Sequence, residues 1–295
     1  TPFELKVSAR QWQSDSDSDV CDNGNTPNFK LSNIDLTHDV LAPSPVDPAD
    51  KVTGNLGVSE VSIASLGSVT ANQTIDEVGV FEITIDKLTY LGEEIPASSS
   101  GPIGRFYPDH FVLSGSLMTE RSDIGTCTSD FSYMGENFQA SFTLTAQNTS
   151  GAQTENYADN FAKLDKLSEL GLVLINNPVS TDPNWASRLV VNDSDLDWPS
   201  VNDADANAGQ HLVQLELALD RGASLDGPYD ALTVAVAPDD GDAQLKSASF
   251  DTDTSGDGAN DHASVSDPTK IRYGRMQIQN TYGPETSALN QPIFI

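Results

Sequence analysis

Apolar and polar residues alternate along most of this chain. The runs 3–9, 80–88 and 138–146 place apolar side chains on alternate residues, and the runs 213–219 and 232–236 repeat the pattern. Glycine, proline, asparagine, aspartate and serine separate these runs. Such alternation over short segments indicates antiparallel strands with one buried face, so the pattern predicts an all-β protein.

A stretch of small residues, IPASSSGPIG at positions 95–104, separates two parts of the chain. Its glycine, proline and serine content is typical of a linker. The part before it has the size of one immunoglobulin-like β-sandwich, and the longer part after it contains further strands. We therefore expect two antiparallel, immunoglobulin-like β-sandwiches in tandem, residues 1–104 and 105–295. The second would contain a long polar loop at 176–209 and an acidic loop at 251–261.

One segment departs from the period of two. Phe161, Leu164 and Leu167 recur at helical spacing within residues 160–171. Gly171 follows them, and glycine is a common residue just after the end of a helix. This segment therefore predicts a short α-helix.

The charge balance is strongly acidic. The 44 aspartate and glutamate residues exceed the 15 lysine and arginine residues, which gives a formal net charge of −29. Such a surface repels phosphate backbones and anionic lipids, so nucleic acids and membrane surfaces are poor partners. No apolar run approaches the roughly 20 residues that a spanning helix needs, so we expect no membrane span. The surface favours cations and suits salty water, where screening weakens self-repulsion.

The chain contains two cysteines, Cys21 and Cys127, and neither belongs to a CxxC motif or a zinc-ligand cluster. Both lie in polar, turn-like segments, which suits a disulfide in an exported protein. Closing a loop of about 100 residues would stabilise the fold by up to about 4.7 kcal/mol. We predict a Cys21–Cys127 disulfide and an oxidising compartment; the alternatives are two unpaired thiols or a partner outside this chain. The start at Thr1, without an initiator methionine, indicates a portion of a longer protein.

The segment DTDTSGDGANDH, residues 251–262, has oxygen-bearing side chains on alternate residues and two glycines. Calcium loops need oxygen ligands at positions 1, 3, 5, 7 and 9 and a glycine at position 6. Counted from Asp253, Gly258 is at position 6, and the loop resembles the DxDxDGxxD loop of type 3 thrombospondin repeats. Ser264 takes the place of the glutamate that ends an EF-hand loop. The predicted ligands are Asp253, Ser255, Asp257, the Ala259 carbonyl and Asp261, with Asp251 as a further ligand.

This spacing predicts a structural Ca²⁺ site with the weak affinity of extracellular modules, about 10⁻⁴ to 10⁻³ M. The alternative is an Asp/Gly turn without a metal. A weaker metal candidate is the group Asp203, Asp205 and Asn207, which lie on alternate residues but lack the glycine at the sixth position.

Two tryptophans, Trp185 and Trp198, lie within the long polar loop. Exposed tryptophans next to aspartate and asparagine can form a platform on which a sugar ring stacks, so both are candidate ligand-binding residues. The alternative is that they pack the loop onto the sandwich.

Catalytic signatures are absent from the sequence, which has no GxSxG, HExxH, Walker or GxGxxG motif. The histidines are His38, His110, His211 and His262, and their positions show no ligand-like spacing. With 44 acidic residues, a pair of carboxylates carries little information about catalysis. We therefore expect a protein that is not an enzyme.

Six stretches occur in order over nearly the whole chain. They are NGNTPNF (23–29), GRFYPDHF (104–111), FSYMGENF (131–138), SFTLTAQNTSGAQTENYADNFAKL (141–164), GPYDALTVAVAPDDGD (227–242) and IRYGRMQIQNTYG (271–283). Together they resemble the C-terminal region of MshQ-type proteins. That family is associated with biogenesis of the mannose-sensitive haemagglutinin (MSHA) type IV pilus in marine Gram-negative bacteria. The resemblance implies export, a location at the cell surface and a link to pili or adhesion, and it carries no assigned reaction.

The chain departs from the resembled family in two ways. Members of the family usually continue past the last strand to a segment with another cysteine, whereas this chain stops at QPIFI. The resemblance therefore implies an alternative partner for Cys127. Family members also often carry lectin-like domains upstream, and this chain contains no such part.

We expect an extracellular, cell-surface protein of a marine Gram-negative bacterium, stiffened by Ca²⁺ and a disulfide. Its function would be structural or adhesive, through pilus or other cell-surface proteins, or through self-association in a filament at exposed sheet edges. One alternative is a calcium-dependent carbohydrate-binding module that takes glycans. Another is a glycoside hydrolase, which would need two carboxylates roughly 5–9.5 Å apart in a cleft.

Overall fold

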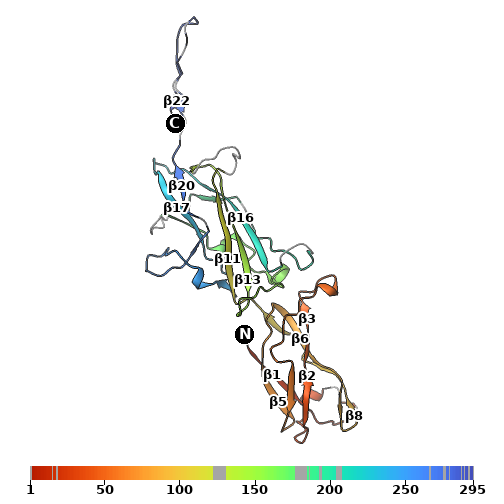
Figure 1. Ribbon diagram of the computed structural model, residues 1–295. Coiled ribbons are helices and arrows are strands. Elements are labelled where there is room, and N and C mark those ends of the chain that lie inside the picture. The colour runs from red at the N-terminus through yellow and green to blue at the C-terminus, as the bar shows by residue number, and fades with distance from the viewer. Residues whose placement is uncertain are drawn as a thin grey trace. The chain divides into compact units, whose positions relative to one another are not determined.

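The computed structural model describes residues 2–14, 16–17, 19–121, 131–176, 185, 187–192, 195–203, 208–265, 267–274, 277–278, 280–286, 288, 290–291 and 293–294. These residues form 22 strands and five short 3₁₀-helices, so the prediction of an all-β fold is confirmed (Figure 1). The chain divides into two compact units. Unit 1 contains Thr1–His110, Thr145–Lys163 and Trp198–His211, and unit 2 contains Phe111–Leu144, Leu164–Asp197 and Leu212–Ile295.

The two units are interleaved along the sequence. The predicted boundary at residue 104 lies just before the first change of unit, which follows His110. Unit 1 also contains two later segments, so the chain does not simply finish one unit before it starts the next. The long polar stretch 176–209 is divided as well, because it contains strand β15 (Leu189–Val191) of unit 2 and ends in unit 1.

Unit 1 is built from short antiparallel sheets. Their orders are β1–β5, β2–β4, β7–β8 and β10–β6–β3, with β9 also paired to β6. The strands are β1 (Phe3–Ser8), β2 (Leu31–Asp35), β3 (Thr37–Ala42), β4 (Glu60–Ile63), β5 (Ser68–Gln73), β6 (Gly79–Ile85), β7 (Leu88–Tyr90), β8 (Glu93–Ile95), β9 (Ser98–Ser99) and β10 (Ile103–Phe106). Three 3₁₀-helices, η1 (Val20–Asp22), η2 (Pro48–Asp50) and η3 (Asp159–Phe161), accompany them.

The core of unit 1 comes from the alternation in its strands. On β6, Phe81 and Ile83 are buried, and the residues between and after them are only half-buried. One cluster of buried residues contains Ile34, Leu36, Val61, Ile63 and Ile83. A second cluster contains Val40, Ile75 and Phe81. Apolar side chains from four strands therefore leave water together, which is the main force that holds these short sheets against one another.

Unit 2 contains two larger sheets. One has the order β15–β16–β13–β11–β18, and the other has the order β12–β20–β17–β14, with β19 also paired to β17. The strands are β11 (His110–Thr119), β12 (Ser132–Tyr133), β13 (Phe138–Gln147), β14 (Val173–Asn176), β16 (Gln210–Leu219), β17 (Tyr229–Val236), β18 (Gln244–Leu245), β19 (Ala263–Ser264) and β20 (Thr269–Arg272). A further pair, β21 (Gln277–Ile278) with β22 (Ile293–Phe294), follows them.

Burial in unit 2 follows the predicted alternation on β13 but not on β17. Every second residue of β13, from Phe138 to Ala146, is fully buried. On β17, all five residues from Leu232 to Val236 are buried, so both faces of this part of the strand are covered. The segment that precedes β14 lies beside the end of β17, where Ala237 N donates to Leu170 O over 2.8 Å.

The predicted helix at 160–171 is wrong. The segment forms η3 and a second short 3₁₀-helix, η4 (Leu167–Leu170), with extended backbone between them. Leu196 N donates to Asp165 O over 2.9 Å, and Lys166 is bridged to Asp195. The backbone between the two turns therefore has partners from distant residues, and a continuous α-helix would use its N–H and C=O groups internally. Gly171 does end η4, at φ 57°.

Among the residues that the structure describes, no helix is long and apolar enough to cross a bilayer.

Candidate functional site

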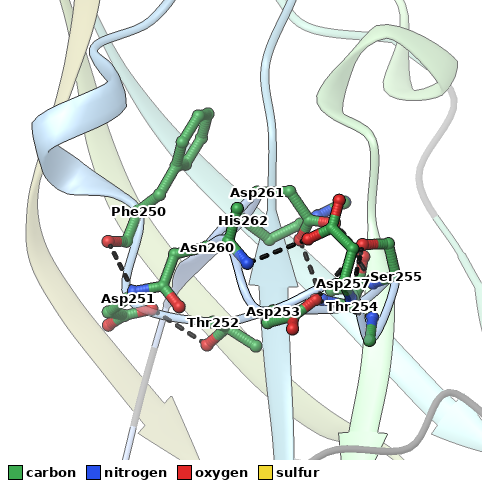
Figure 2. Close-up of polar contacts among 12 residues, drawn as sticks. Phe250, Asp251, Thr252, Asp253, Thr254, Ser255, Asp257, Asn260, Asp261 and His262 are labelled. Carbon is green, nitrogen blue, oxygen red and sulfur yellow. Dashed lines mark hydrogen bonds and ion pairs between the residues drawn. The ribbon is translucent and has the colours of Figure 1, made fainter.

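The acidic loop, residues 251–262, lies in unit 2 between η5 (Ser247–Ser249) and β19. Its two ends are paired, because Asp251 N donates to His262 O over 3.0 Å and Asp261 N donates to Thr252 O over 2.9 Å. Gly256 and Gly258 have φ angles of 77° and 92°, which side-chain-bearing residues rarely adopt, so they let the chain reverse. Figure 2 shows the polar side chains of the loop and the bonds among them.

Asp253 organises the centre of this loop. Its Oδ2 accepts a hydrogen bond from Gly258 N over 2.8 Å, and its Oδ1 accepts one from Gly256 N over 2.7 Å. Ser255 Oγ donates to the same Oδ1 over 3.2 Å. The backbone bond from Gly258 is the main cause that lowers the pKa of Asp253 below its usual value. Asp253 is therefore ionised at neutral pH and holds the two glycine N–H groups in place.

Asp261 closes the other side of the loop (Figure 2). Its Oδ1 accepts from Thr254 N and from His262 Nδ1, each over 2.9 Å. Its Oδ2 accepts from Thr254 Oγ1 over 3.0 Å and from Ser255 N over 3.2 Å. Partial desolvation alone would raise the pKa of Asp261, but the bonds from His262 and Thr254 outweigh it and lower the pKa to about 2.

The remaining acids of the loop also accept bonds from its backbone. Asp251 Oδ1 accepts from Ser264 N over 2.8 Å, and Asp257 Oδ1 accepts from Ala259 N over 2.8 Å. Across the part of the chain that the structure describes, no group of three or more His, Cys, Asp or Glu side chains is arranged to hold a metal ion. The loop thus uses its carboxylates to fix its own turns, and the predicted Ca²⁺ ligation by these residues stays a prediction.

The weaker metal candidate is described only in part. Asp203 Oδ2 accepts from Ser200 N over 3.1 Å, within a turn that Asp203 N closes by donating to Ser200 O over 3.0 Å. Asp205 and Asn207 lie outside the described residues. Asp203 is thus placed as a turn residue.

The two candidate tryptophans have different surroundings. Trp185 is only 3% exposed and packs edge-on against Tyr229, with ring centroids 5.4 Å apart. Trp198 is half-buried and lies 4.8 Å from the ring of Tyr157 and 5.6 Å from that of His211. Trp185 therefore has no free face on which a sugar could stack, which agrees with the packing alternative, whereas Trp198 keeps part of its surface in water.

Of the two cysteines in the predicted disulfide, only Cys21 lies among the described residues. Cys21 is a free and exposed thiol in η1, and its N donates to Asp19 Oδ1 over 2.9 Å. Cys127 lies outside the described residues. The structure thus contains no bridge at Cys21, and the pairing with Cys127 stays a prediction.

Each histidine has a partner. His38 Nε2 lies 2.9 Å from Thr53 O. The two ring nitrogens of His110 lie 2.8 Å from Asp109 Oδ2 and 3.2 Å from Gln147 Oε1. His262 bonds to Asp261, and His211 lies against Trp198, as described above.

A buried carboxylate in unit 1 gave no signal in the sequence. Glu77 is 7% exposed, and its carboxylate accepts three backbone N–H bonds. Val78 N and Asn156 N donate to Oε1 over 2.8 and 3.1 Å, and Glu155 N donates to Oε2 over 3.1 Å. Burial is the largest influence on its pKa and outweighs these bonds, so the pKa rises to about 7. Two of the three donors lie almost 80 positions away along the chain.

Two asparagine amides extend this contact. Asn156 Nδ2 donates to Val52 O over 2.8 Å and to Val78 O over 2.9 Å. Asn148 Nδ2 donates to Asp76 O over 3.0 Å. These bonds fasten the late segment 145–163 of unit 1 to the turn before β6, and Glu77 lies at their centre.

Two protein-family models match consecutive segments of the chain. The model for the second domain of DUF6701 matches residues 1–76, and the model for the third domain of DUF6701 matches residues 77–265. The junction of the two models falls at Glu77. Comparisons with curated proteins and with solved structures found no match. From the two consecutive matches, which cover most of its length, the chain belongs to the DUF6701 family.

Proposed function

We propose that this protein is an exported, non-enzymatic component of a bacterial surface, with a structural or adhesive role linked to MSHA-type pili. The observation that carries the proposal is the position of the stretches that resemble MshQ-type proteins. The stretches 131–138 and 271–283 are far apart in sequence, but they meet in the sheet as β12 and β20, with Ser132 opposite Ile271. A resemblance that includes two paired strands far apart in the sequence supports a shared architecture rather than a shared reaction.

We infer that both units are immunoglobulin-like sandwiches. Antiparallel sheets in which alternate residues of β6 and β13 are buried support this assignment. Sandwiches of this kind have free edges, and edge pairing is a common way for surface proteins to join. The proposed partners are therefore pilus subunits, other surface proteins or a second copy of this chain, outside a marine Gram-negative cell.

The location can be tested directly in the bacterium that makes the protein. Intact cells would be treated with a membrane-impermeant biotin reagent, with an abundant cytoplasmic protein as the control for lysis. We expect the protein to be labelled on intact cells, and deletion of its gene to reduce the number of pili seen by electron microscopy. Labelling only after lysis would contradict a surface location, and normal piliation in the deletion strain would contradict the link to pili.

We further propose that the acidic loop binds a structural Ca²⁺ ion. The support is that Asp253 and Asp261 have lowered pKa values and Gly258 holds a positive φ, as a tight oxygen-rich loop requires. Binding would exchange some of the N–H bonds of these carboxylates for metal bonds. The ion would then stiffen unit 2 rather than take part in a reaction.

Thermal melting with Ca²⁺ and with a chelator tests this site. At a Ca²⁺ concentration ten times Kd, binding would stabilise the fold by about 1.4 kcal/mol, or a rise in Tm of roughly 3 °C. Asp253→Asn and Asp261→Asn should abolish the rise, whereas Asp86→Asn, an exposed acid of unit 1, should retain it. An unchanged wild-type Tm with Ca²⁺ would contradict the proposal.

A further inference from the structure

Two turns of unit 1 carry leucine where the backbone disfavours it: one connects β4 to β5, which lie in different sheets, and the other joins the paired strands β7 and β8. Leu66 and Gly67 form the turn between β4 and β5, and Leu91 and Gly92 form the turn between β7 and β8. The φ angles are 57° and 61° in the first turn and 55° and 90° in the second. Two central residues with positive φ define a type I′ turn, for which Asn-Gly is the preferred pair. A bulky residue such as leucine is strained in this region.

Neither leucine is placed where packing would offset that strain. Leu66 is 71% exposed and Leu91 is 88% exposed. Asparagine adopts a positive φ more readily than leucine, and its polar side chain is better suited to exposure to water. A strained backbone that holds an apolar side chain in solvent indicates a role outside the folded unit.

The two turns lie at the same end of unit 1. Ala9 N donates to Gly67 O over 2.8 Å, and a Cβ on Gly67 would come within 2.2 Å of Thr26 O. Phe29 N donates to Thr26 O over 3.0 Å, and the ring of Phe29 lies 4.5 Å from that of Tyr90, the residue before the second leucine. Figure 1 shows β5, which starts after the first turn, and β8, which starts after the second, in this part of the unit.

The segment between β1 and β2 adds two more exposed apolar side chains. Trp12 is 75% exposed and Val20 is 53% exposed. The segment is fastened at this end because Gln11 N donates to Gly24 O and Thr26 N donates to Ala9 O, each over 2.8 Å. We call the set Trp12, Val20, Leu66 and Leu91 the apolar tip.

Acidic side chains predominate around the apolar tip. The described acids of residues 9–30 and 86–95 are Asp17, Asp19, Asp22, Asp86, Glu93 and Glu94, and the bases are Arg10, Lys30 and Lys87. Lys87 is paired with Glu94 over 2.7 Å, and Arg10 Nη1 donates to Asn23 O over 2.9 Å. Two of the three bases therefore already have partners, and the chain as a whole carries a net charge of −29.

We propose that the apolar tip is a docking surface for another protein, whose contact surface has an apolar recess bordered by lysine and arginine. The leucines and Trp12 enter the recess, and the acids around them face the bases of the partner. The same acids disfavour an anionic membrane and a second copy of this chain. The inference deepens the proposed surface role by naming the contact surface, and it rests on that role only for where the partner is found.

The test uses purified full chain and immobilised synthetic peptides. One set has a leucine-rich centre flanked by lysine and arginine; a second has acidic flanks, and a third has serine in place of the apolar centre. We expect wild-type protein to bind the first set at least tenfold more tightly than the other two. The double variant Leu66→Asn/Leu91→Asn should lose at least tenfold in affinity.

Two controls separate binding from folding. Val46→Asn changes a side chain of unit 1 that is also 88% exposed. Val46 follows β3, whose Ala42 end pairs with Val80, away from the end of β6 that leads into β7. This variant should bind within twofold of wild type. The double variant should melt at or above the wild-type Tm, because Asn-Gly suits both turns.

Several results would overturn the docking surface. They are failure of wild type to bind the basic peptides, equal binding by the double variant, or a preference for acidic flanks. Tip-dependent binding to phosphatidylcholine or phosphatidylglycerol vesicles would assign the surface to a membrane, and a tip-dependent dimer in sedimentation would assign it to a second copy. Each of these results leaves the proposed surface location standing, because only the biotin labelling experiment tests that.

Discussion

Two carboxylates of this protein accept similar hydrogen bonds, yet their pKa values move in opposite directions. Glu77 accepts three backbone N–H bonds, and its pKa rises to about 7. Asp261 accepts bonds from two backbone N–H groups, a hydroxyl and an imidazole, and its pKa falls to about 2. The Asp261 side chain is 35% exposed, whereas Glu77 is 7% exposed. Burial raises the pKa of both groups, but at Asp261 the bonds and the charge of His262 outweigh it, whereas at Glu77 burial prevails and the neighbouring Glu155 raises the pKa further.

The comparison also separates two uses of an acid. Asp261 stabilises a surface loop because its charge stays partly in contact with water and gains N–H partners. Glu77 joins the late segment 145–163 to the turn before β6, but its charge is held in the interior of unit 1. Its ionised form therefore costs free energy even though every bond described above is made.

Removal of the Glu77 side chain should have the largest effect. Glu77→Ala would leave two buried N–H groups, those of Val78 and Asn156, and the part-buried N–H group of Glu155 without their acceptor. Each unsatisfied buried donor costs about 1–3 kcal/mol, so we expect a loss of about 3 kcal/mol or more in the free energy of unfolding. Denaturant unfolding measures this loss. Glu155→Ala removes an exposed neighbouring side chain and should change stability by about 0.5 kcal/mol at most; equal losses in the two variants would contradict the role of Glu77.

The pH dependence should show the cost of the buried charge. The pKa of Glu77 in the folded state is about 7, above its ordinary value of 4.5, so its contribution to stability is complete below pH 4.5. The contribution is lost as the pH rises through about 7, and the total change is about 3 kcal/mol.

Glu77→Gln stays neutral at every pH, so a comparison with wild type isolates the stability that is lost when Glu77 ionises. The free energy of unfolding would be measured from pH 4.5 to 8.5 for both proteins. The stability of wild type relative to the variant should fall as the pH rises, because only wild type loses stability from this position. Two parallel curves would show that Glu77 does not titrate in this range.

Asp261→Asn should have the smallest effect. The lowered pKa means that Asp261 contributes stability above its ordinary pKa of 3.8, and that this contribution is lost as the pH falls through about 2. Solvent screening at a side chain that is 35% exposed reduces the value to about 1 kcal/mol. Acid unfolding between pH 5 and 2 should therefore be less steep in the variant. Asp86→Asn, at an exposed acid of unit 1, is the control for the removal of one surface charge; an acid profile of Asp261→Asn identical to that of wild type would contradict the prediction.

The strands were the most predictable part of the fold. The alternation in β13 predicted five inward-facing residues, and all five are fully buried. The alternation of apolar and polar residues did not predict burial correctly where a strand is covered on both faces, as in β17. Periodicity also failed at 160–171, where the spacing of Phe161, Leu164 and Leu167 suits a helix but distant residues supply backbone partners to the extended segment.

The acidic loop was predictable as a loop but not in its detail. The two glycines and the alternate oxygens indicated a tight turn, and the structure has one. The direction of each carboxylate depends on which N–H groups the folded loop presents, so spacing alone could not show that Asp253 accepts from Gly256 and Gly258. The positive φ angles of Leu66 and Leu91 gave no signal in the sequence, because leucine is not a residue that such turns prefer.

By itself, the sequence determined the all-β class, the positions of most turns and the acidic surface, because periodicity, glycine and charge act over a few neighbouring residues. Only the tertiary structure decided that 145–163 and 198–211 belong to unit 1, that Glu77 is buried and that the segments with four exposed apolar side chains lie at one end of that unit. Each of these depends on contacts between residues far apart in the chain, and local pattern contains no information about which distant segments will exclude water together.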